Sequence, residues 1–376
     1  MKILQLTVHF SPNVGGVETH LNDLVEALVR RKNEVFVLAY RPLTTKVDWK
    51  VYERRKGSEI LRIPWIPGIF YNLVESPVLE FLYLFPGLFL LLPFIIIIKD
   101  PDVIHAHGLV AGFVGVCWGR LFGKRVVIST HNIYHFPDTG AYRNFVKWIF
   151  GKSDFVMGLS KQETGELSSL GIQKTRLGTF TYWIDLNKFK PISKIEAKKR
   201  VGWGEKFVSL FVGRLVSEKG IRPVLQAAES WNKNIHLAVV GFGPLEAEVK
   251  RISSNNKNVV FLGKIPNENL PVYYSAADIL IIPSTHEEGF GRVILESLAC
   301  GTPVIGSKRG AIPEAMDESV GQLIDVNVKN IRGAAEYFYK NPDRLMKLSK
   351  NARKFAEEKY SAANVEQIIR AYTKET

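Results

Sequence analysis

Residues 283–303 have the sequence PSTHEEGFGRVILESLACGTP, and the residues before them, 279–282, are ILII. A short run of isoleucine and leucine is typical of a buried strand, and here it leads into a polar loop with two glycines. An apolar helix is expected after the loop. Glu288 then lies in the loop, and Glu296, eight positions later, lies about two turns further on. The segment therefore predicts a strand–loop–helix unit with two carboxylates on roughly the same side.

This loop has chemistry that suits a nucleotide sugar. The backbone N–H groups of Gly289, Phe290 and Gly291 are expected at the positive end of the helix, where they attract hydrogen-bond acceptors and anions. Glu288 could then bind sugar hydroxyls, and Glu296 could bind a ribose. The spacing of the two glutamates alone also fits a solvated helix face, because helices often carry surface carboxylates in this way.

The wider segment resembles a known motif. With the strand before it and CGTPVI at 300–305, it resembles the Glu-x7-Glu motif of retaining glycosyltransferase family 4. The resemblance extends over nearly the whole chain. It implies α/β architecture of the GT-B type, in which two Rossmann-like parallel-sheet domains face each other across a cleft. It also implies transfer of a sugar from a nucleoside diphosphate sugar, with Glu288 on the sugar hydroxyls and Glu296 on the ribose.

The rest of the chain contains two series of short strands that alternate with helical stretches, which indicates parallel sheets covered by helices. A length of 376 residues also exceeds one typical core. The expected strands are 3–8, 35–40, 103–106, 126–130 and 155–159, and then 208–212, 236–240, 259–262, 279–282, 304–305 and 322–324. The resemblance implies an acceptor-binding domain at 1–185 and a nucleotide-sugar-binding domain at 186–359, with a last helix at about 360–376 that packs back on the first domain.

A cationic loop, GRLVSEKG at 213–220, follows the first strand of the second series. An arginine and a lysine in such a loop can hold a diphosphate, Arg214 through parallel hydrogen bonds and Lys219 as a point charge. A solvated turn that needs Gly220 for its backbone is the alternative. The loop matches the pyrophosphate loop of the family, which implies that Arg214 and Lys219 bind the donor diphosphate.

A glycine pair in NVGGVE at 13–18 follows the first strand of the chain. Paired glycines let a phosphate approach the backbone, and the start of the next helix favours an anion. A tight turn between strand and helix is the alternative. The resemblance implies that Gly15 and Gly16 face the donor diphosphate. Ile265, after the strand at 259–262, is expected to offer its backbone to the base.

Histidines lie at the ends of two expected strands, where parallel sheets form binding sites. We expect His105 and His107 to point to opposite faces of their strand. Single histidines at such positions are more often hydrogen-bonded core residues than catalysts. The resemblance implies that His131 is the active-site histidine near the donor sugar and that His107 lines the same cleft. Residues 182–184 are Tyr-Trp-Ile, where the family usually has Asn-Gly-Val, so the rim near the linker is bulkier.

Asp100 and Asp102 form an Asp-x-Asp pattern that could bind a metal ion. Pro101 and the strand that follows instead indicate a junction between a helix and a strand. The family uses no obligatory metal. We therefore expect no metal site and no cofactor, with the nucleotide sugar as the donor substrate and Arg214 and Lys219 stabilising the departing diphosphate.

The segment 79–98 is unusually apolar and approaches the length of a membrane span. Expected strands of one sheet lie on both sides of it, so a bilayer would divide that sheet. We expect either a surface that enters one leaflet, with Leu84 and Leu88 exposed, or a helix buried in the domain. A net charge of +13 fits an anionic ligand or an anionic membrane.

These features favour a cytoplasmic enzyme held peripherally on the inner face of the membrane, with a uridine- or guanosine-type donor and a lipid-linked or glycan acceptor. The chain opens with a strand, so no signal peptide is expected, and no nucleic-acid-binding module is recognised. Two alternatives stay open: a nucleotide-sugar epimerase of the same fold and an inactive scaffold protein on a membrane. The complete set of Arg214, Lys219, Glu288 and Glu296 favours an active transferase.

Overall fold

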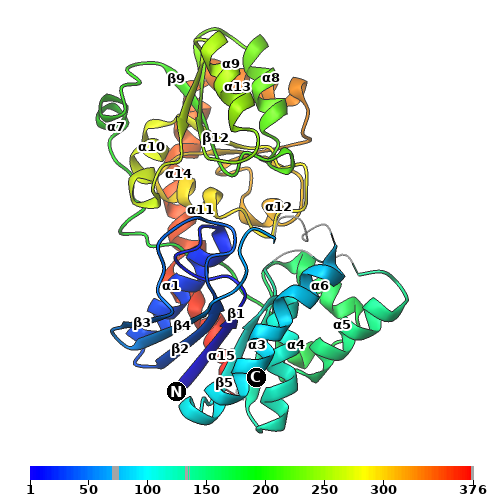
Figure 1. Cartoon of the computed structure of the whole chain (residues 1–376). Coiled ribbons are helices and arrows are strands. Elements are labelled where there is room, and N and C mark those ends of the chain that lie inside the picture. Colours follow the sequence, from blue (N-terminus) through cyan, green and yellow to red (C-terminus); the bar gives the residue numbers. More distant parts are fainter. Residues whose placement is uncertain (70–75, 132–133, 135, 374–376) are drawn as a thin grey trace. The chain divides into compact units, whose positions relative to one another are not determined.

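The computed structural model describes residues 1–69, 76–131, 134 and 136–373. The chain forms two compact units, one of Met1–Tyr182 with Ala363–Thr376 and one of Trp183–Ala362 (Figure 1). The boundaries expected from the sequence lay after Asp185 and after Lys359. Each unit contains its own sheet and its own hydrophobic core.

The first unit is built on a sheet with the strand order β3-β4-β2-β1-β5-β6-β7-β8. Its strands are β1 (Lys2–Thr7), β2 (Glu34–Tyr40), β3 (Tyr52–Arg55), β4 (Ser58–Ile63), β5 (Val103–His107), β6 (Arg125–Ser129), β7 (Phe155–Gly158) and β8 (Leu177–Thr179). Neighbouring strands pair in parallel except β3 and β4, which form an antiparallel hairpin at the edge. The expected strands did not include this hairpin, because charged residues typical of an edge strand interrupt its apolar pattern.

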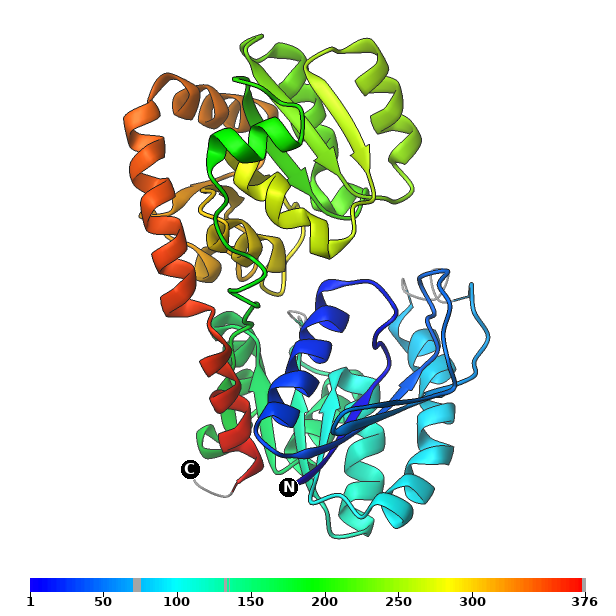
Figure 2. The ribbon, with the colours of Figure 1, turned by 90° about the vertical axis from the view of Figure 1, so that its left-hand side faces the viewer.

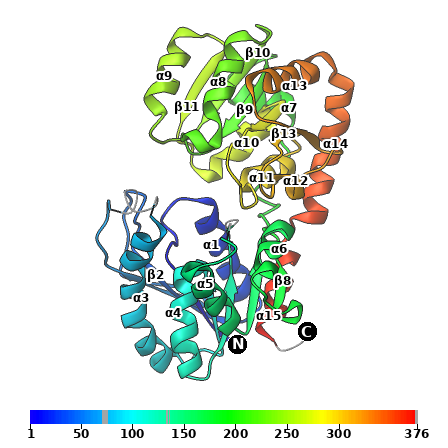
Figure 3. The same ribbon diagram turned by 90° about the vertical axis from the view of Figure 1, so that its right-hand side faces the viewer.

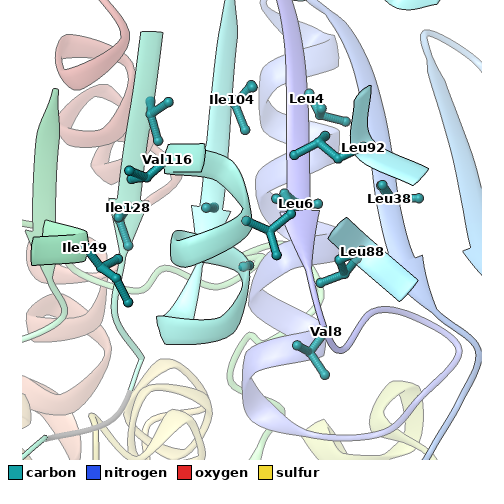
Figure 4. Close-up of a cluster of buried hydrophobic side chains, with 14 of the residues drawn as sticks. Leu4, Leu6, Val8, Leu38, Leu88, Leu92, Ile104, Val116, Ile128 and Ile149 are labelled. Atoms are coloured by element: carbon teal, nitrogen blue, oxygen red, sulfur yellow. The ribbon is translucent and has the colours of Figure 1, made fainter. Parts of the chain in front are cut away.

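Helices cover both faces of this sheet, as its largely buried strands require. One face, which includes Leu4, Leu6, Leu38, Ile104 and Ile128, packs against α3 (Pro77–Lys99), α4 (Gly108–Leu121) and α5 (Ala141–Lys152) (Figures 3 and 4). On the other face lie α1 (Gly16–Arg30) and the C-terminal helix α15 (Val365–Tyr372) (Figure 2). The helix α6 (Lys161–Ser169) packs beside β7 and β8.

The apolar segment forms the single helix α3, with Pro86 and Pro93 inside it. Leu84 and Leu88 are only 1% and 0% exposed, so the expectation that they lie on the surface is wrong. Both belong to the hydrophobic core of the first unit, and Leu88 faces the sheet (Figure 4). Leu90 and Phe94, on the outer side, are 66% and 62% exposed.

Among the described residues, Val78–Lys99 is the one helix long and apolar enough to cross a membrane. A core helix of a soluble protein can have the same length and apolar composition. Since one side of α3 packs on the sheet, the helix is both a core element and an apolar surface.

The second unit has a fully parallel sheet with the order β11-β10-β9-β12-β13-β14. Its strands are β9 (Phe207–Val212), β10 (Ile235–Val240), β11 (Val259–Gly263), β12 (Ile279–Ile282), β13 (Val304–Ser307) and β14 (Gly321–Ile324). A core around Leu237, Val239 and Ile281 packs against α8 (Ile221–Ser230) and α13 (Val328–Lys340). Outside this cluster, α11 (Arg292–Ala299) packs against α10 (Leu270–Ala276) and α14 (Pro342–Lys359). The remaining helices are α7 (Lys194–Arg200), α9 (Glu246–Asn255) and the short α12 (Ile312–Ala315).

Across each sheet, the parallel strands run in descending chain order up to one point and in ascending order after it. In the second unit the reversal lies between β9 and β12, and in the first unit it lies between β1 and β5. At such a place the loops at the carboxyl ends of the two strands turn in opposite directions, and α/β proteins bind their ligands there. The loops after these four strands are therefore candidate binding loops.

Candidate active site

In the second unit, the loops after β9 and β12 pack against each other. The Thr285 N–H donates to the Glu218 carbonyl at 2.9 Å, and the His286 Nδ1 atom lies 2.9 Å from the same carbonyl. Gly220 has a left-handed backbone, and a Cβ atom there would lie 1.8 Å from the Pro283 carbonyl oxygen. The close approach of the two loops therefore requires glycine at this position.

This packing brings Lys219 and Glu288 together. Their ammonium and carboxylate groups form an ion pair, and the Ser284 hydroxyl donates to the same carboxylate at 2.5 Å. Burial acts to raise the pKa of Glu288, but the Lys219 charge and the Ser284 hydrogen bond outweigh it, and the pKa lies below its usual value. Glu288 is therefore an anion at neutral pH, and it holds Lys219 at the sheet edge.

Arg214 lies earlier in the cationic loop and is exposed. Its guanidinium makes no hydrogen bond or ion pair with any residue in the described ranges. The backbone beside it is fixed, since the Leu215 N–H donates to the Phe242 carbonyl at 2.8 Å. A Cβ atom on Gly241 would lie 1.9 Å from the Gly213 carbonyl oxygen. A rigid backbone therefore presents an uncompensated positive charge that can bind an anion.

Glu296 lies inside α11 and has a separate set of partners. The Tyr274 hydroxyl donates to one carboxylate oxygen at 2.8 Å, and the Asn267 amide donates to the other at 3.2 Å. The Arg292 Nε atom lies 3.4 Å from that second oxygen. Burial raises the pKa of Glu296 against the opposing charge of Arg292. A ligand that reaches Glu296 therefore has to share its oxygens with these side chains.

The residues between the two glutamates differ in their surroundings. Phe290 is buried, and its ring centroid lies 5.9 Å from that of Tyr360, so its side chain anchors the loop to the core. Gly291 precedes α11 with a left-handed backbone, and Gly289 is partly exposed. These glycines keep the entrance of α11 free of side chains. Ile265 follows the end of β11 and is partly buried.

In the first unit, Gly15 precedes α1 as its N-cap residue, and Gly16 is the first residue of that helix. A Cβ atom on Gly15 would lie 2.2 Å from the carboxylate of Glu18, which is itself buried and accepts from the Asn13 amide at 2.6 Å. The side-chain oxygen of Asn13 accepts in turn from the Thr44 hydroxyl at 2.8 Å. This carboxylate places a negative charge near the glycine pair, which favours a hydrogen-bond donor at this loop over a bare phosphate.

His107 and His131 meet at the carboxyl ends of β5 and β6. The His107 Nδ1 atom lies 3.0 Å from His131 Nε2, and His131 Nδ1 lies 2.9 Å from the Tyr182 hydroxyl. Burial lowers the pKa of His131 to about 3 and that of His107 well below its usual value, so both rings are neutral at pH 7.

His105 lies on the same face as His107, and their ring centroids are 4.1 Å apart. The expectation that they point to opposite faces is wrong, since residues two positions apart in a strand share one face. The three rings therefore belong to one buried polar group.

Asp100 and Asp102 lie before the amino end of β5, whereas the histidines lie toward the carboxyl ends of β5 and β6. Asp100 pairs with Lys124, and the Asp102 carboxylate accepts from the Lys2 N–H at 2.8 Å. Both aspartates thus stabilise the junction between α3 and β5. A search of the described residues finds no group of three or more His, Cys, Asp or Glu side chains that could hold a metal ion.

Two family models together match most of the chain. The model described as Glycosyltransferase Family 4 matches residues 14–188, and the model described as Glycosyl transferases group 1 matches residues 193–355. The chain belongs to the family-4-type glycosyltransferases. The resemblance drawn from the motifs is thereby confirmed.

The chain is 28% identical to an uncharacterised glycosyltransferase of Methanocaldococcus jannaschii, over 97% of this chain and 96% of that protein. It is 26% identical to a GDP-mannose-dependent alpha-(1-6)-phosphatidylinositol monomannoside mannosyltransferase of Mycolicibacterium smegmatis, over 86% and 85% of the two chains.

Among solved structures, sucrose-phosphate synthase of Thermosynechococcus elongatus has a TM-score of 0.81 at 23% identity and covers 99% and 98% of the two chains. HepE of Anabaena in complex with UDP has a TM-score of 0.75 at 21% identity and covers 98% of each chain. These likenesses confirm the expected GT-B fold.

Several residues that contact the expected site residues were not predicted from the sequence. Ser284 lies within the motif, and a hydroxyl four residues before Glu288 is a signal that could have been noticed. Asn267 lies in the connection between β11 and α10, and Tyr274 lies in α10 itself. Tyr372 contacts His105 from the far end of the chain, and no local pattern indicates that contact.

Gly220→Ala should lower the stability of the second unit. A left-handed backbone costs a non-glycine residue about 1–2 kcal/mol, and the new Cβ atom would also overlap the Pro283 carbonyl. Gly202→Ala is the matched control, because Gly202 has a similar φ (72° against 69°) and no atom within 4 Å of its Cβ position. Denaturant unfolding should show a larger loss for Gly220→Ala, and equal losses would contradict the close packing of the two loops.

Proposed function

We propose that this glycosyltransferase is a retaining, metal-independent enzyme that moves a hexose from a nucleoside diphosphate sugar to an acceptor at a membrane. The observation that carries the proposal is the cationic loop at the strand reversal of the second sheet. There Arg214 is exposed and uncompensated on a fixed backbone, and Lys219 lies beside the anionic Glu288. Two such cations can stabilise the charge that develops on a departing diphosphate.

Glu288 is suited to position the donor sugar. Its lowered pKa keeps it ionised, so it can accept hydrogen bonds from sugar hydroxyls while it orients Lys219. An ionised carboxyl with a low pKa is a poor proton donor at neutral pH, so its role in this proposal is orientation and not acid catalysis. The acceptor would attack the face of the sugar that the diphosphate leaves, which retains the anomeric configuration.

The proposed donor carries uridine or guanosine. HepE of Anabaena is solved with UDP, and the relative from Mycolicibacterium smegmatis is named as GDP-mannose-dependent. In this proposal Glu296 binds the ribose, the backbone of Ile265 meets the base, and the N–H groups of residues 289–291 bind the sugar or phosphate.

The first unit is proposed to bind the acceptor and to complete the donor site. Its contributions would be the backbone of Gly15 and Gly16 and the side chains of His107 and His131. These residues lie at the reversal between β1 and β5 or just beside it, where α/β sheets bind ligands.

The proposed acceptor is lipid-linked, because the first unit has an exposed apolar surface. The outer side of α3 exposes Leu90, Phe94, Ile97 and Ile98. Burying each of these side chains in a membrane would contribute about 1.5–3 kcal/mol. Exposed basic residues on the helices beside α3, such as Lys147, would add about 1 kcal/mol each near anionic headgroups. We propose that the enzyme lies on the cytoplasmic face of the membrane through this surface.

Arg214→Ala should weaken the binding of UDP or GDP by roughly 10- to 150-fold, since a hydrogen bond to a charged group contributes about 1.5–3 kcal/mol. Transfer should fall by roughly two to three orders of magnitude, and Lys219→Ala should lower it similarly. Arg332→Ala removes an exposed arginine from α13 and is the control. Isothermal titration calorimetry with each nucleotide measures the effect, and an unchanged affinity in Arg214→Ala would sink the diphosphate assignment.

Activity assays with UDP- and GDP-linked sugars distinguish the proposed transferase from the two alternatives, an epimerase and an inactive scaffold protein. An epimerase would convert the donor sugar without any acceptor. An inactive scaffold would leave the donor unchanged in the presence of membrane lipids. Transfer to a lipid fraction, followed by extraction and mass spectrometry, supports only the proposed function.

Transfer should continue in excess EDTA, because Arg214 and Lys219 supply the positive charge that a metal ion supplies in other enzymes. The new glycosidic bond should keep the anomeric configuration of the donor, which proton NMR of the product reports. Loss of transfer in EDTA that magnesium or manganese restores would contradict the metal-independent part of the proposal. Inversion would contradict the retaining part.

The wild-type protein should float with vesicles that contain anionic lipid, and the binding should weaken in salt. The double substitution Leu90→Gln with Phe94→Gln should reduce flotation but leave nucleotide affinity unchanged, because both side chains are exposed on α3. Ile195→Gln, at an even more exposed apolar position in the second unit, is the control. A wild-type protein that stays with the soluble fraction would refute the membrane surface.

A further inference from the structure

A continuous chain of buried hydrogen bonds runs through the first unit and includes Tyr372 of α15. We call it the histidine relay. Its members, in order, are Tyr182, His131, His107, Gln5, Tyr372, His105 and Ser129. All seven side chains are buried. The relay joins His131, the proposed donor-site histidine, to the C-terminal helix α15.

The amide of Gln5 sets the direction of every hydrogen bond on one side of the relay. An amide oxygen only accepts, so the His107 Nε2 atom, at 2.6 Å from Gln5 Oε1, carries the proton. A neutral imidazole with Nε2 protonated has an accepting Nδ1 atom. His131 Nε2–H therefore donates to His107 Nδ1 over 3.0 Å. By the same step, Tyr182 O–H donates to His131 Nδ1 over 2.9 Å.

The amide nitrogen of Gln5 sets the direction on the other side. It only donates, and its partner at 3.2 Å is the Tyr372 hydroxyl. When that hydroxyl gives its own proton to His105 Nδ1, at 2.7 Å, His105 Nε2–H donates to Ser129 Oγ, at 2.7 Å. Each contact between two relay members then has one donor and one acceptor, and all three histidines carry their proton on Nε2.

The C-terminal segment contacts the relay at its centre and at its Tyr182 end. Tyr372, the last residue of α15, contributes its hydroxyl to the centre. At the Tyr182 end, the Asn364 amide donates to the Tyr182 carbonyl at 3.3 Å, and the Gln367 amide oxygen accepts from the Thr181 N–H at 2.8 Å. The His20 ring stacks on the Tyr182 ring with centroids 4.1 Å apart.

We propose that Gln5 and Tyr372 are positioning residues that hold His131 as a neutral hydrogen-bond acceptor at Nδ1, for a hydroxyl group of the donor sugar. The sugar hydroxyl would take the place of the Tyr182 hydroxyl at that nitrogen. The assignment of the sugar rests on the proposed function, whereas the tautomer and the direction of the relay do not. Burial keeps the relay uncharged, since it lowers the pKa of His105 and His131 to about 3 and raises that of Tyr372.

Reversal of the Gln5 amide would keep the same contacts and reverse the hydrogen bonds that lead to His131. His131 would then carry its proton on Nδ1 and donate to Tyr182, and a ligand would meet a donor instead of an acceptor. Gln5 and Tyr372 thus decide whether His131 accepts or donates, without touching the ligand. A side chain with a purely structural role would fill the same space without setting a tautomer.

Long-range proton–nitrogen NMR spectra of the full-length protein, with ¹⁵N-labelled histidine, test the proposal directly. The expected result is the Nε2–H tautomer for His105, His107 and His131 at pH 7. His236 and His286, in the second unit, are internal controls that no relay substitution should affect. The Nδ1–H tautomer at His131, or an even mixture, would overturn the proposal even if the protein is fully active.

Two substitutions at Gln5 are expected to have different effects on the tautomer of His131. Gln5→Glu keeps an acceptor for His107 Nε2–H, so His131 should keep its tautomer. Gln5→Met removes that acceptor, so His107 and His131 should become mixtures of tautomers. An unchanged spectrum in Gln5→Met would contradict the role of the amide. If Gln5→Met does not fold, Tyr372→Phe replaces it, because loss of the hydroxyl frees the amide to reverse, and an unchanged spectrum there would count equally against the proposal.

Binding measurements separate this inference from the proposed function. In Tyr372→Phe, the affinity for UDP or GDP alone should stay unchanged, while transfer should fall by roughly 3- to 10-fold, the equivalent of one hydrogen bond. If the wild-type protein binds neither nucleotide, the proposed function fails, and the NMR result still stands by itself. If nucleotide binding is normal and Tyr372→Phe transfers sugar at the wild-type rate, the positioning role is refuted.

Discussion

Parallel strand pairing is the constraint on which both units depend. When strands pair in parallel, each needs a crossover connection, and all the loops that leave their carboxyl ends collect at one edge of the sheet. Residues far apart in the chain are thereby brought together, as with Lys219 after β9 and Glu288 after β12. The same rule places His107 and His131 side by side at the ends of β5 and β6. Function in this chain follows from where the chain order reverses.

The charged groups after β9 and β12 in the second unit differ in whether an opposite charge neutralises them. Lys219 and Glu288 are partly or largely buried, and each needs the other because an isolated buried charge is strongly unfavourable. Arg214 is exposed, so water solvates it and it needs no partner until an anion arrives. Because Arg214 is unpaired, it can exchange water for a diphosphate without first breaking the Lys219–Glu288 ion pair. That arrangement fits the chemistry of the family to which the chain belongs.

The first unit combines two features that rarely occur together. Its sheet has an apolar face that α3 covers, and α3 itself presents further apolar side chains outward. On the opposite face of the sheet, strand residues such as Gln5, His105 and His107 form a buried polar network with α15. The first feature supports the proposed membrane surface. The second gives the C-terminal helix a direct chemical connection to the histidine beside the proposed donor site.

The sequence by itself determined the two series of strands and helices, the cationic and glycine-containing loops, and the strand–loop–helix unit that carries Glu288 and Glu296. These features arise from hydrophobic periodicity and from glycines that local backbone geometry requires, so neighbouring residues suffice to indicate them. The tertiary structure decided which side of α3 is buried, that β3 and β4 form a hairpin, and that His105 and His107 share a face with Tyr372. It also placed Glu288 with Lys219 and Glu296 with Tyr274. These outcomes depend on contacts between residues distant in the chain, and burial of one side chain rather than another is settled only when the elements pack.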